Sequence, residues 1–256
     1  MLSSSPQEYR EALGILANSS QHIPIIAQAI RQHVLPRIAN QDSMLDVGVG
    51  IGILTHHFKA DFKEITVLDI NPAVETDLKK HPYKIEICDF FKYETDKKFD
   101  FVLCSHVMYH FDEQQMKDFI LRLQSLVNPG GYCFIALIAP RGKNHLFHIK
   151  FKPDYVNSQQ IAKILEKEGI AFDRIEAASP HHLITDDPAK MRSLLKFFLI
   201  ENCLRQTSSS LQVEQIQLIN TLLDEEVANA KLPDSNVHDF EQEDDYFLIR
   251  SPGYRR

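Results

Sequence analysis

The sequence predicts an α/β fold, in which a mostly parallel β-sheet carries helices on both faces. Apolar strand-like segments alternate with helical segments between Met44 and Ala139. A glycine-rich turn, Gly48 to Gly52, follows the first of these strands and leads into a helix, and Asp69 ends the next strand. A strand, a glycine turn and a helix start together form a binding corner, so we expect a nucleotide-like ligand at the carboxyl edge of the sheet.

The individual elements follow from hydrophobic patterns taken in chain order. Before residue 41 the pattern is helical, because Ile26, Ile30 and Val34 recur with a helical period. Apolar or alternating runs then predict strands at 43–49, 64–70, 83–88, 99–109, 132–139, 170–177 and 246–250. Helices are predicted at 72–81, 112–127, 157–169, 188–204 and 211–231, and the third of these has N-cap residues at its start and Gly169 at its end.

The segment between the last two strands is much longer than an ordinary connection, at about seventy residues against the ~4–6 of a typical loop. Most of it has a helical pattern, so we expect an inserted subdomain. The predicted organisation is an N-terminal helical cap at 1–41 and a main domain at 42–256, with a helical insertion at 178–240. The acid-rich run Asp239–Tyr246 is predicted to be a solvated loop.

Composition and charge narrow the function classes. The chain has 256 residues and a net charge of -7, with no basic patch, so nucleic acid is not an expected partner. No apolar run approaches the ~20 residues of a membrane span, and no secretory signal is recognisable. The four cysteines are widely spaced, which indicates reduced thiols in a cytoplasmic protein. We expect a small-molecule substrate, no nucleic acid or membrane partner, and a monomer or weak dimer.

The glycine series decides between ligand classes only together with its neighbours. It reads G-x-G-x-G, whereas a dinucleotide fold has G-x-G-x-x-G, and Ile53 stands where that last glycine belongs. Asp69 lies 21 positions after Gly48, where an acid accepts hydrogen bonds from ribose hydroxyls. Asp89 follows the third strand and can accept from an adenine amino group while Phe90 packs on the ring. Two acids without a cation favour a positively charged ligand without phosphate, which describes S-adenosylmethionine.

Four stretches carry a resemblance to a known family. In this order and spacing, LDVGVGIG, VLDINP, CDFF and FDFVLCSHVMYHF resemble the class I S-adenosylmethionine-dependent methyltransferases over Met44–Ala139. The resemblance implies a Rossmann-like sheet of seven strands, with the last strand antiparallel and inserted beside the fifth, and a helical lid over the substrate. It implies S-adenosylmethionine as donor and S-adenosylhomocysteine as product. The candidate cofactor-binding residues are Asp46, Gly48, Gly50, Gly52, Asp69, Ile70, Asp89, Phe90 and Ser105, although Asp46 could instead brace the glycine turn.

The two ends of the chain show a second resemblance, to histamine N-methyltransferase. In that enzyme an N-terminal acid holds the substrate ammonium, but Asn18–Ile30 contains no carboxylate here, and Gln21 or His22 falls near the matching place. A glutamine of that enzyme corresponds to His106. A shared architecture with a different substrate is therefore implied.

Methyl transfer mainly requires that donor and acceptor are held close and in line. His106 follows the fourth strand at the ligand edge, and histidine titrates near neutral pH. We predict that His106 contacts the acceptor or takes its proton as the catalytic residue, against the alternative that it only packs beneath a lid. The other candidate substrate contacts are Tyr9, Gln21, Tyr109 and Glu243, with Asp244 as the alternative to Glu243. The remaining histidine groups are typical of surface or packing positions, so no metal site is expected.

The predicted function is a methyltransferase that uses S-adenosylmethionine and a small-molecule acceptor such as an amine nitrogen. The signature of nucleobase amino-methylation, Asn-Pro-Pro-Tyr, is absent, and Ser105–Tyr109 stands in its place. A non-catalytic regulatory protein that binds S-adenosylmethionine is the alternative. A nicotinamide-dependent oxidoreductase is a third possibility, against which the glycine spacing argues.

Overall fold

The computed structural model describes residues 6–176, 180–204 and 212–251. Residue contacts divide the chain into two compact units. The sheet unit comprises Ile23–Pro140, Val156–Ala178 and Asp244–Arg256, and the helical unit comprises Met1–His22, Arg141–Tyr155 and Ser179–Glu243. Each unit is therefore assembled from three separate segments of the chain.

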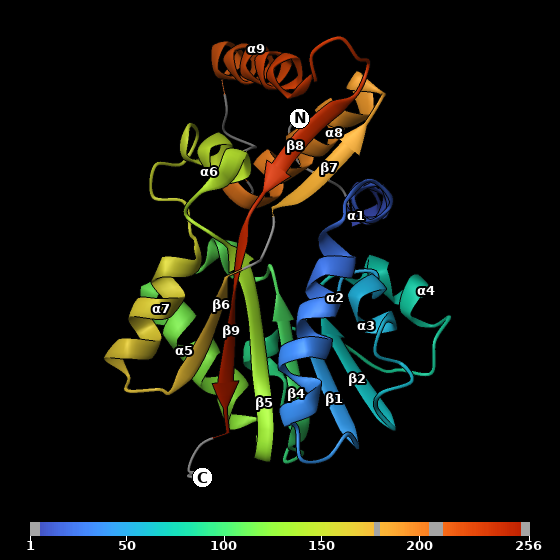
Figure 1. Ribbon diagram of the computed structural model, residues 1–256, viewed down its shortest axis with the longest axis vertical. Coiled ribbons are helices and arrows are strands. Elements are labelled where there is room, and N and C mark those ends of the chain that lie inside the picture. Colours follow the sequence, from blue (N-terminus) through green and yellow to red (C-terminus); the bar gives the residue numbers. More distant parts are fainter. Residues whose placement is uncertain (1–5, 177–179, 205–211, 252–256) are drawn as a thin grey trace. The chain divides into compact units, whose positions relative to one another are not determined.

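The sheet unit is built on a seven-stranded sheet (Figure 1). Its strands are β1 (Ser43–Val47), β2 (Glu64–Asp69), β3 (Lys84–Ile87), β4 (Phe99–Ser105), β5 (Val127–Ile138), β6 (Phe172–Glu176) and β9 (Asp244–Arg250). Their order in space is β3-β2-β1-β4-β5-β9-β6. Strand β9 is antiparallel to both of its neighbours, and the other pairs are parallel. The predicted Rossmann-like sheet, with its antiparallel last strand beside the fifth, is confirmed.

Helices cover both faces of this sheet (Figure 1). On one face, alternate strand residues such as Met44, Val67 and Phe101 form a core with α2 (His22–His33), α3 (Ile53–His56) and α4 (Glu75–Leu78). On the opposite face, α5 (Glu113–Ser125) and α7 (Ser158–Lys167) pack against β5 and against each other. Both of these helices begin with a capping box, in which an N-cap side chain and the third helical residue satisfy each other's backbone amides. The N-cap of α7 is Asn157, as predicted.

The helical unit has its own core. It contains α1 (Pro6–Ser19), α6 (Gly142–Ile149), α8 (Pro188–Leu199), α9 (Val213–Ala230) and a π-helix at Ile200–Leu204. It also contains a two-stranded antiparallel sheet, β7 (His181–Thr185) with β8 (His238–Gln242). The prediction of a mostly helical insertion did not include these two strands. Each of them has only one large buried apolar side chain, Leu183 and Phe240, which is too weak a pattern to predict a strand.

The acid-rich run Asp239–Tyr246 is not the solvated loop that was predicted. It forms the end of β8 and the start of β9, and the side chains of Asp244 and Asp245 are fully buried. Acidic residues are rarely buried without partners, and both aspartates have them. Composition alone misplaced this segment because it does not reveal these partners.

The division into a cap at 1–41 and a lid at 178–240 stays a prediction, and residue 178 lies outside the described residues. Helix α2 buries Ile26, Ala27 and Ile30 in the core of the sheet unit. Within the described parts of the chain, no helix combines the length and the apolar character that crossing a bilayer requires.

Candidate active site

The glycine turn joins β1 to α3 in a backbone conformation that side chains rarely adopt. Gly48, Gly50 and Gly52 have φ angles of 75°, 57° and 79°. A Cβ atom on Gly48 would lie 2.3 Å from Cγ2 of Val107. Glycine is therefore required at Gly48 both by the left-handed backbone and by the close approach of the segment after β4. A turn without side chains leaves room for a ligand against the backbone, which is the cradle that the proposed donor requires.

Asp69, the last residue of β2, holds the glycine turn in place. Its Oδ2 atom accepts a hydrogen bond from the Gly50 amide at 2.8 Å, and its Oδ1 atom accepts one from the Asn71 amide at 2.8 Å. The residue is 7% exposed. An ionised carboxylate can accept about four hydrogen bonds, so these two contacts are compatible with a further role as acceptor for ribose hydroxyls.

Asp46 lies beneath the same turn, with 3% of its surface exposed. Its carboxylate accepts a hydrogen bond from the Thr55 hydroxyl, which ties β1 to α3. Burial, opposed by this hydrogen bond and assisted by the nearby charge of Asp69, raises the pKa of Asp46 to about 7. These contacts favour the bracing role over direct contact with a ligand.

The next candidate residues lie just after β3, just after β2 and at the end of β4. Asp89 caps the short 3-10 helix Phe90–Lys92 by accepting from the Phe91 amide at 3.0 Å. The Phe90 ring is 4% exposed and lies 4.7 Å, centroid to centroid, from Phe119 of α5. Most of its surface is therefore already covered by protein, whereas Phe91 is 39% exposed. Ile70 is 63% exposed directly after Asp69, and Ser105 is the last residue of β4. Their contacts with a ligand stay predictions.

His106 has an unusual backbone conformation at the end of β4. Its φ is 59°, which is uncommon for a residue other than glycine, and such strained residues cluster at functional sites. Its amide donates to the carbonyl of Ala136 on β5 at 3.0 Å, which fixes the turn. The side chain is 17% exposed.

Both ring nitrogens of His106 have partners. Nδ1 is hydrogen-bonded to the hydroxyl of Tyr109, which lies on the 3-10 helix Met108–His110. Nε2 lies 3.2 Å from Oδ2 of Asp244, whose side chain is fully buried. Asp244 is the first residue of β9 and pairs with Ile138 of β5, so its carboxylate reaches across β5 to the histidine. The structure thus joins Asp244, His106 and Tyr109 into one hydrogen-bonded chain.

The sequence did not predict that Asp244 would pair with His106. This aspartate was considered only as the alternative to Glu243, because it belongs to an acid-rich run just before the last strand. Glu243 itself forms an ion pair with Arg141, whose Nε lies 2.6 Å from Oε2. This pairing offsets the negative charge of Glu243.

The other predicted substrate contacts belong to the helical unit. Tyr9 packs on Phe197, with ring centroids 5.6 Å apart. Gln21 is exposed, and its amide donates to the carbonyl of His182 at 3.2 Å. Their roles in substrate binding stay predictions. His106, Tyr109 and the donor-site candidates all belong to the sheet unit.

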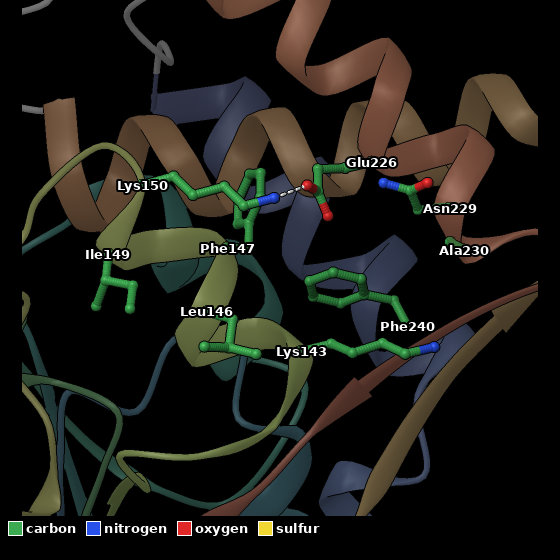
Figure 2. A pocket seen from close by; sticks show the side chains of 9 residues that line it. All are labelled: Lys143, Leu146, Phe147, Ile149, Lys150, Glu226, Asn229, Ala230 and Phe240. Carbon is green, nitrogen blue, oxygen red and sulfur yellow. Dashed lines mark hydrogen bonds and ion pairs between the residues drawn. The ribbon is translucent and has the colours of Figure 1, made fainter.

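Figure 2 shows a cavity of about 600 Å³ within the helical unit. Helices α6 and α9 and strand β8 form its walls, where Phe147 and Phe240 meet edge to face. Lys150 pairs with Glu226 at one side. The nine side chains drawn around the cavity include none of the predicted site residues. The candidate active site is therefore defined by the glycine turn and by the hydrogen-bonded chain of Asp244, His106 and Tyr109.

A family model described as a methyltransferase domain matches residues 21–175. The chain belongs to this methyltransferase family. The match begins in α2 and ends in β6, so it spans the glycine turn, Asp69 and His106. The class I S-adenosylmethionine-dependent methyltransferase predicted from the sequence is confirmed at the level of the family and its fold.

Individual relatives of this methyltransferase are distant. It is 30% identical over 134 residues to an rRNA adenine N-6-methyltransferase from Bacteroides fragilis, which covers 49% of the chain and 48% of the relative. It is 32% identical over 66 residues to the chemotaxis protein methyltransferase Cher2 from Pseudomonas putida, which covers 26% of the chain and 22% of the relative. The matches therefore span less than half of the length of each curated relative.

A solved structure matches almost the whole chain. It is the N-methyltransferase NodS from Bradyrhizobium japonicum WM9, in complex with S-adenosylhomocysteine. The two chains share 15% identity with a TM-score of 0.53, over 96% of this methyltransferase and 98% of NodS. At this identity the likeness establishes the fold.

Proposed function

We propose that this methyltransferase transfers a methyl group from S-adenosylmethionine to the nitrogen of a small-molecule amine. The hydrogen-bonded chain of Asp244, His106 and Tyr109 carries this proposal, because it supplies a proton acceptor at the edge of the sheet where such folds bind ligands. Basic amines are protonated near neutral pH and must lose a proton before nitrogen can attack. A buried acid behind a histidine suits that requirement.

The sheet unit provides the donor site in this proposal. Gly48 to Gly52 would receive the amino-acid part of the donor against the backbone, Asp69 would accept from the ribose hydroxyls, and Asp89 would accept from the adenine amino group. When bound, S-adenosylmethionine supplies an electrophilic methyl group on a sulfonium. The protein must then hold the acceptor nitrogen in line with that methyl group, which can provide most of the rate enhancement.

Nitrogen as the acceptor atom has support from the fold neighbour. NodS is described as an N-methyltransferase, and its chain is covered over nearly its full length. The finer resemblance to histamine N-methyltransferase has no support among the comparisons, and the proposal does not depend on it. We infer that Tyr9 and Gln21, which belong to the helical unit, are among the candidate contacts of a small acceptor.

Methylation of RNA is the second candidate function, because one curated relative is described as an rRNA adenine N-6-methyltransferase. Two features of the chain argue against it. The net charge of -7 does not favour a phosphate backbone. The segment after β4 reads Ser105-His106-Val107-Met108-Tyr109, without the Asn-Pro-Pro-Tyr signature of nucleobase amino-methylation.

The test is a turnover assay with methyl-labelled S-adenosylmethionine. The purified protein is incubated with a panel of primary and secondary alkylamines, with ribosomal RNA, and with a metabolite extract, and labelled products are identified by mass spectrometry. We expect label on amine nitrogen and an equal amount of S-adenosylhomocysteine. Label on RNA alone would replace the proposal with the second candidate.

Calorimetry separates the remaining possibilities. We expect S-adenosylhomocysteine to bind and NAD to give no heat. Tight binding of S-adenosylhomocysteine without any labelled product would favour a non-catalytic regulatory protein. Binding of NAD instead would overturn the proposed donor.

A further inference from the structure

We propose that the hydroxyl of Tyr109, and not the imidazole of His106, takes the proton from the methyl acceptor. In this arrangement His106 stores the proton and Asp244 positions and stabilises the imidazole. The inference rests on the proposed amine methylation and specifies how its proton leaves. It changes the role predicted for His106, from the group that meets the acceptor to the middle member of a relay.

The partners of His106 determine which of its nitrogens carries the hydrogen. Asp244 lies 3.2 Å from Nε2, and an ionised carboxylate can only accept. With Asp244 ionised, as the relay requires, neutral His106 carries its hydrogen on Nε2 and donates it to Asp244. Nδ1 is then an acceptor, and it receives the hydrogen of the Tyr109 hydroxyl. The relay is thus oriented from Tyr109 toward Asp244.

The same geometry makes Tyr109 the end of the chain that can meet a substrate. Both nitrogens of His106 are engaged, by Tyr109 and by Asp244. A hydroxyl that donates its hydrogen to Nδ1 can accept a hydrogen bond on its oxygen at the same time. Tyr109 is held close to His106 because the short 3-10 helix Met108–His110 brings it back beside the end of β4.

The proposed step balances in atoms and charge. An acceptor ammonium gives one proton to the Tyr109 oxygen while the hydrogen of Tyr109 moves to Nδ1 of His106. The imidazole becomes an imidazolium, which is stabilised by the carboxylate of Asp244. The lone pair left on nitrogen forms a bond to the donor methyl carbon, the carbon–sulfur bond breaks, and sulfur keeps its electron pair.

The first test compares two acceptors that differ in basicity. One is the best alkylamine of the turnover panel, and the other is its trifluorinated analogue, whose amine is already neutral at the assay pH. For Tyr109→Phe we expect kcat to fall roughly a hundredfold or more with the basic amine, as is typical when a proton acceptor is lost. With the neutral analogue we expect little change relative to the wild type, because that amine has no proton to give up.

Tyr132→Phe is the matched control. Tyr132 is a buried tyrosine on β5 that pairs with Arg250, toward the opposite edge of the sheet from His106. We expect this variant to retain wild-type kcat with both amines. Equal losses with both amines in Tyr109→Phe would show that Tyr109 acts only in positioning or packing, and would overturn the proposed proton route.

The second test reads the hydrogen position without turnover. In protein labelled with nitrogen-15 at histidine, NMR distinguishes a nitrogen that carries hydrogen from one that does not. We expect His106 to carry it on Nε2, and Asp244→Asn to change that signal. In Asp245→Asn we expect no change, because Asp245 is an equally buried aspartate of β9 that binds Ser158 and Arg174 instead. Neutral His106 with hydrogen on Nδ1 would overturn the relay.

The two failures are distinguishable. A wild-type protein that methylates no amine would refute the proposed function, and the relay with it. Amine turnover that persists equally in Tyr109→Phe would refute the relay alone.

Discussion

Four aspartates at the carboxyl edge of the sheet show how much the surroundings of a residue decide its role. Asp69 and Asp89 accept hydrogen bonds from backbone amides near the expected donor. Asp46 is buried against a hydroxyl, and Asp244 is buried against an imidazole. The same carboxyl group can therefore serve as a ligand contact, a brace or a proton-relay partner.

The first residue-scale prediction concerns Asp69→Asn. The change replaces one acceptor oxygen by an amide that donates, so it weakens both the hold on Gly50 and the acceptance of ribose hydroxyls. We expect S-adenosylhomocysteine to bind roughly ten- to a hundredfold more weakly, as for the loss of a charged hydrogen bond. Calorimetry measures the affinity, and Asp173→Asn, which removes an exposed partner of Arg37, is the control. Unchanged affinity in Asp69→Asn would remove Asp69 from the donor site.

The second residue-scale prediction concerns Asp46 and pH. Folding raises the pKa of Asp46 from its ordinary value of 3.8 to about 7. The protonated form is thus favoured in the folded state, and the free energy of unfolding falls as pH rises from about 4 to 7. Asp46→Asn removes this titration. The variant gains stability relative to the wild type over that interval, by on the order of 4 kcal/mol if the whole shift is realised.

Urea unfolding of both proteins between pH 4 and pH 8 measures this difference. The contributions of carboxylates that titrate in both proteins cancel in the difference between their unfolding free energies. A difference in unfolding free energy that stays constant across the interval would show that Asp46 titrates normally.

At the scale of elements, the glycine turn requires a backbone that only glycine adopts without strain. We expect Gly48→Ala to destabilise the protein by about 1–3 kcal/mol and to weaken binding of S-adenosylhomocysteine, because φ is 75° and the added Cβ would collide with Val107. Gly14→Ala is the control, since Gly14 lies within α1 and a Cβ there would meet nothing within 4 Å. We expect it to stabilise the protein by about 0.5–1 kcal/mol. Thermal unfolding with calorimetric titration measures both.

The double variant Gly48→Ala with Val107→Ala separates the two causes. It removes the collision and keeps the unfavourable φ, so we expect partial recovery of stability. Full recovery would show that Val107 alone imposes the glycine.

The sheet was predictable because its strands are buried on both faces. Runs such as Phe99–Ser105 and Tyr132–Ala139 are almost continuously apolar. Such a pattern is typical of a parallel strand that is buried on both faces. β7 and β8 were missed because their strands are short and polar, and because they pair with a partner more than fifty positions away. Hydrophobic periodicity contains no information about such a partner.

The candidate site was predictable where the chemistry is local. Gly48, Gly52 and Asp69 follow from a turn and the strand after it, within one stretch of chain. The pairing of His106 with Asp244 spans 138 positions and depends on β9 lying beside β5. Acidic residues usually lie at the surface. Only the fold shows that Asp244 is buried and pairs with His106.

At the scale of the whole molecule, each of the two units has a hydrophobic core of its own among the residues that the structure describes. All the candidate donor residues belong to the sheet unit. We therefore expect donor binding to depend on the core of the sheet unit. We expect acceptor turnover to depend on the helical unit as well, because Tyr9 and Gln21 are candidate acceptor contacts.

Two substitutions that shorten a buried side chain test this division. Leu223→Ala and Phe134→Ala each empty a fully buried position, in the helical unit and in the sheet unit respectively. Each costs about 2–5 kcal/mol locally. We expect Leu223→Ala to raise the acceptor KM and to change the affinity for S-adenosylhomocysteine by less than roughly twofold, as for independent sites. Hydrogen exchange locates the loosened core, and an equal loss of donor affinity in both variants would contradict the division.

Strand β9 brings its two adjacent aspartates to opposite faces of the sheet. Asp244 meets His106, and Asp245 meets Ser158 and Arg174. If β9 slipped by one residue during folding, every side chain would exchange faces. Such a slip would separate the histidine from its acid and the guanidinium of Arg174 from its own. The two aspartates of β9 therefore favour a single register of this strand, because a chain paired in the wrong register loses both buried pairs at once.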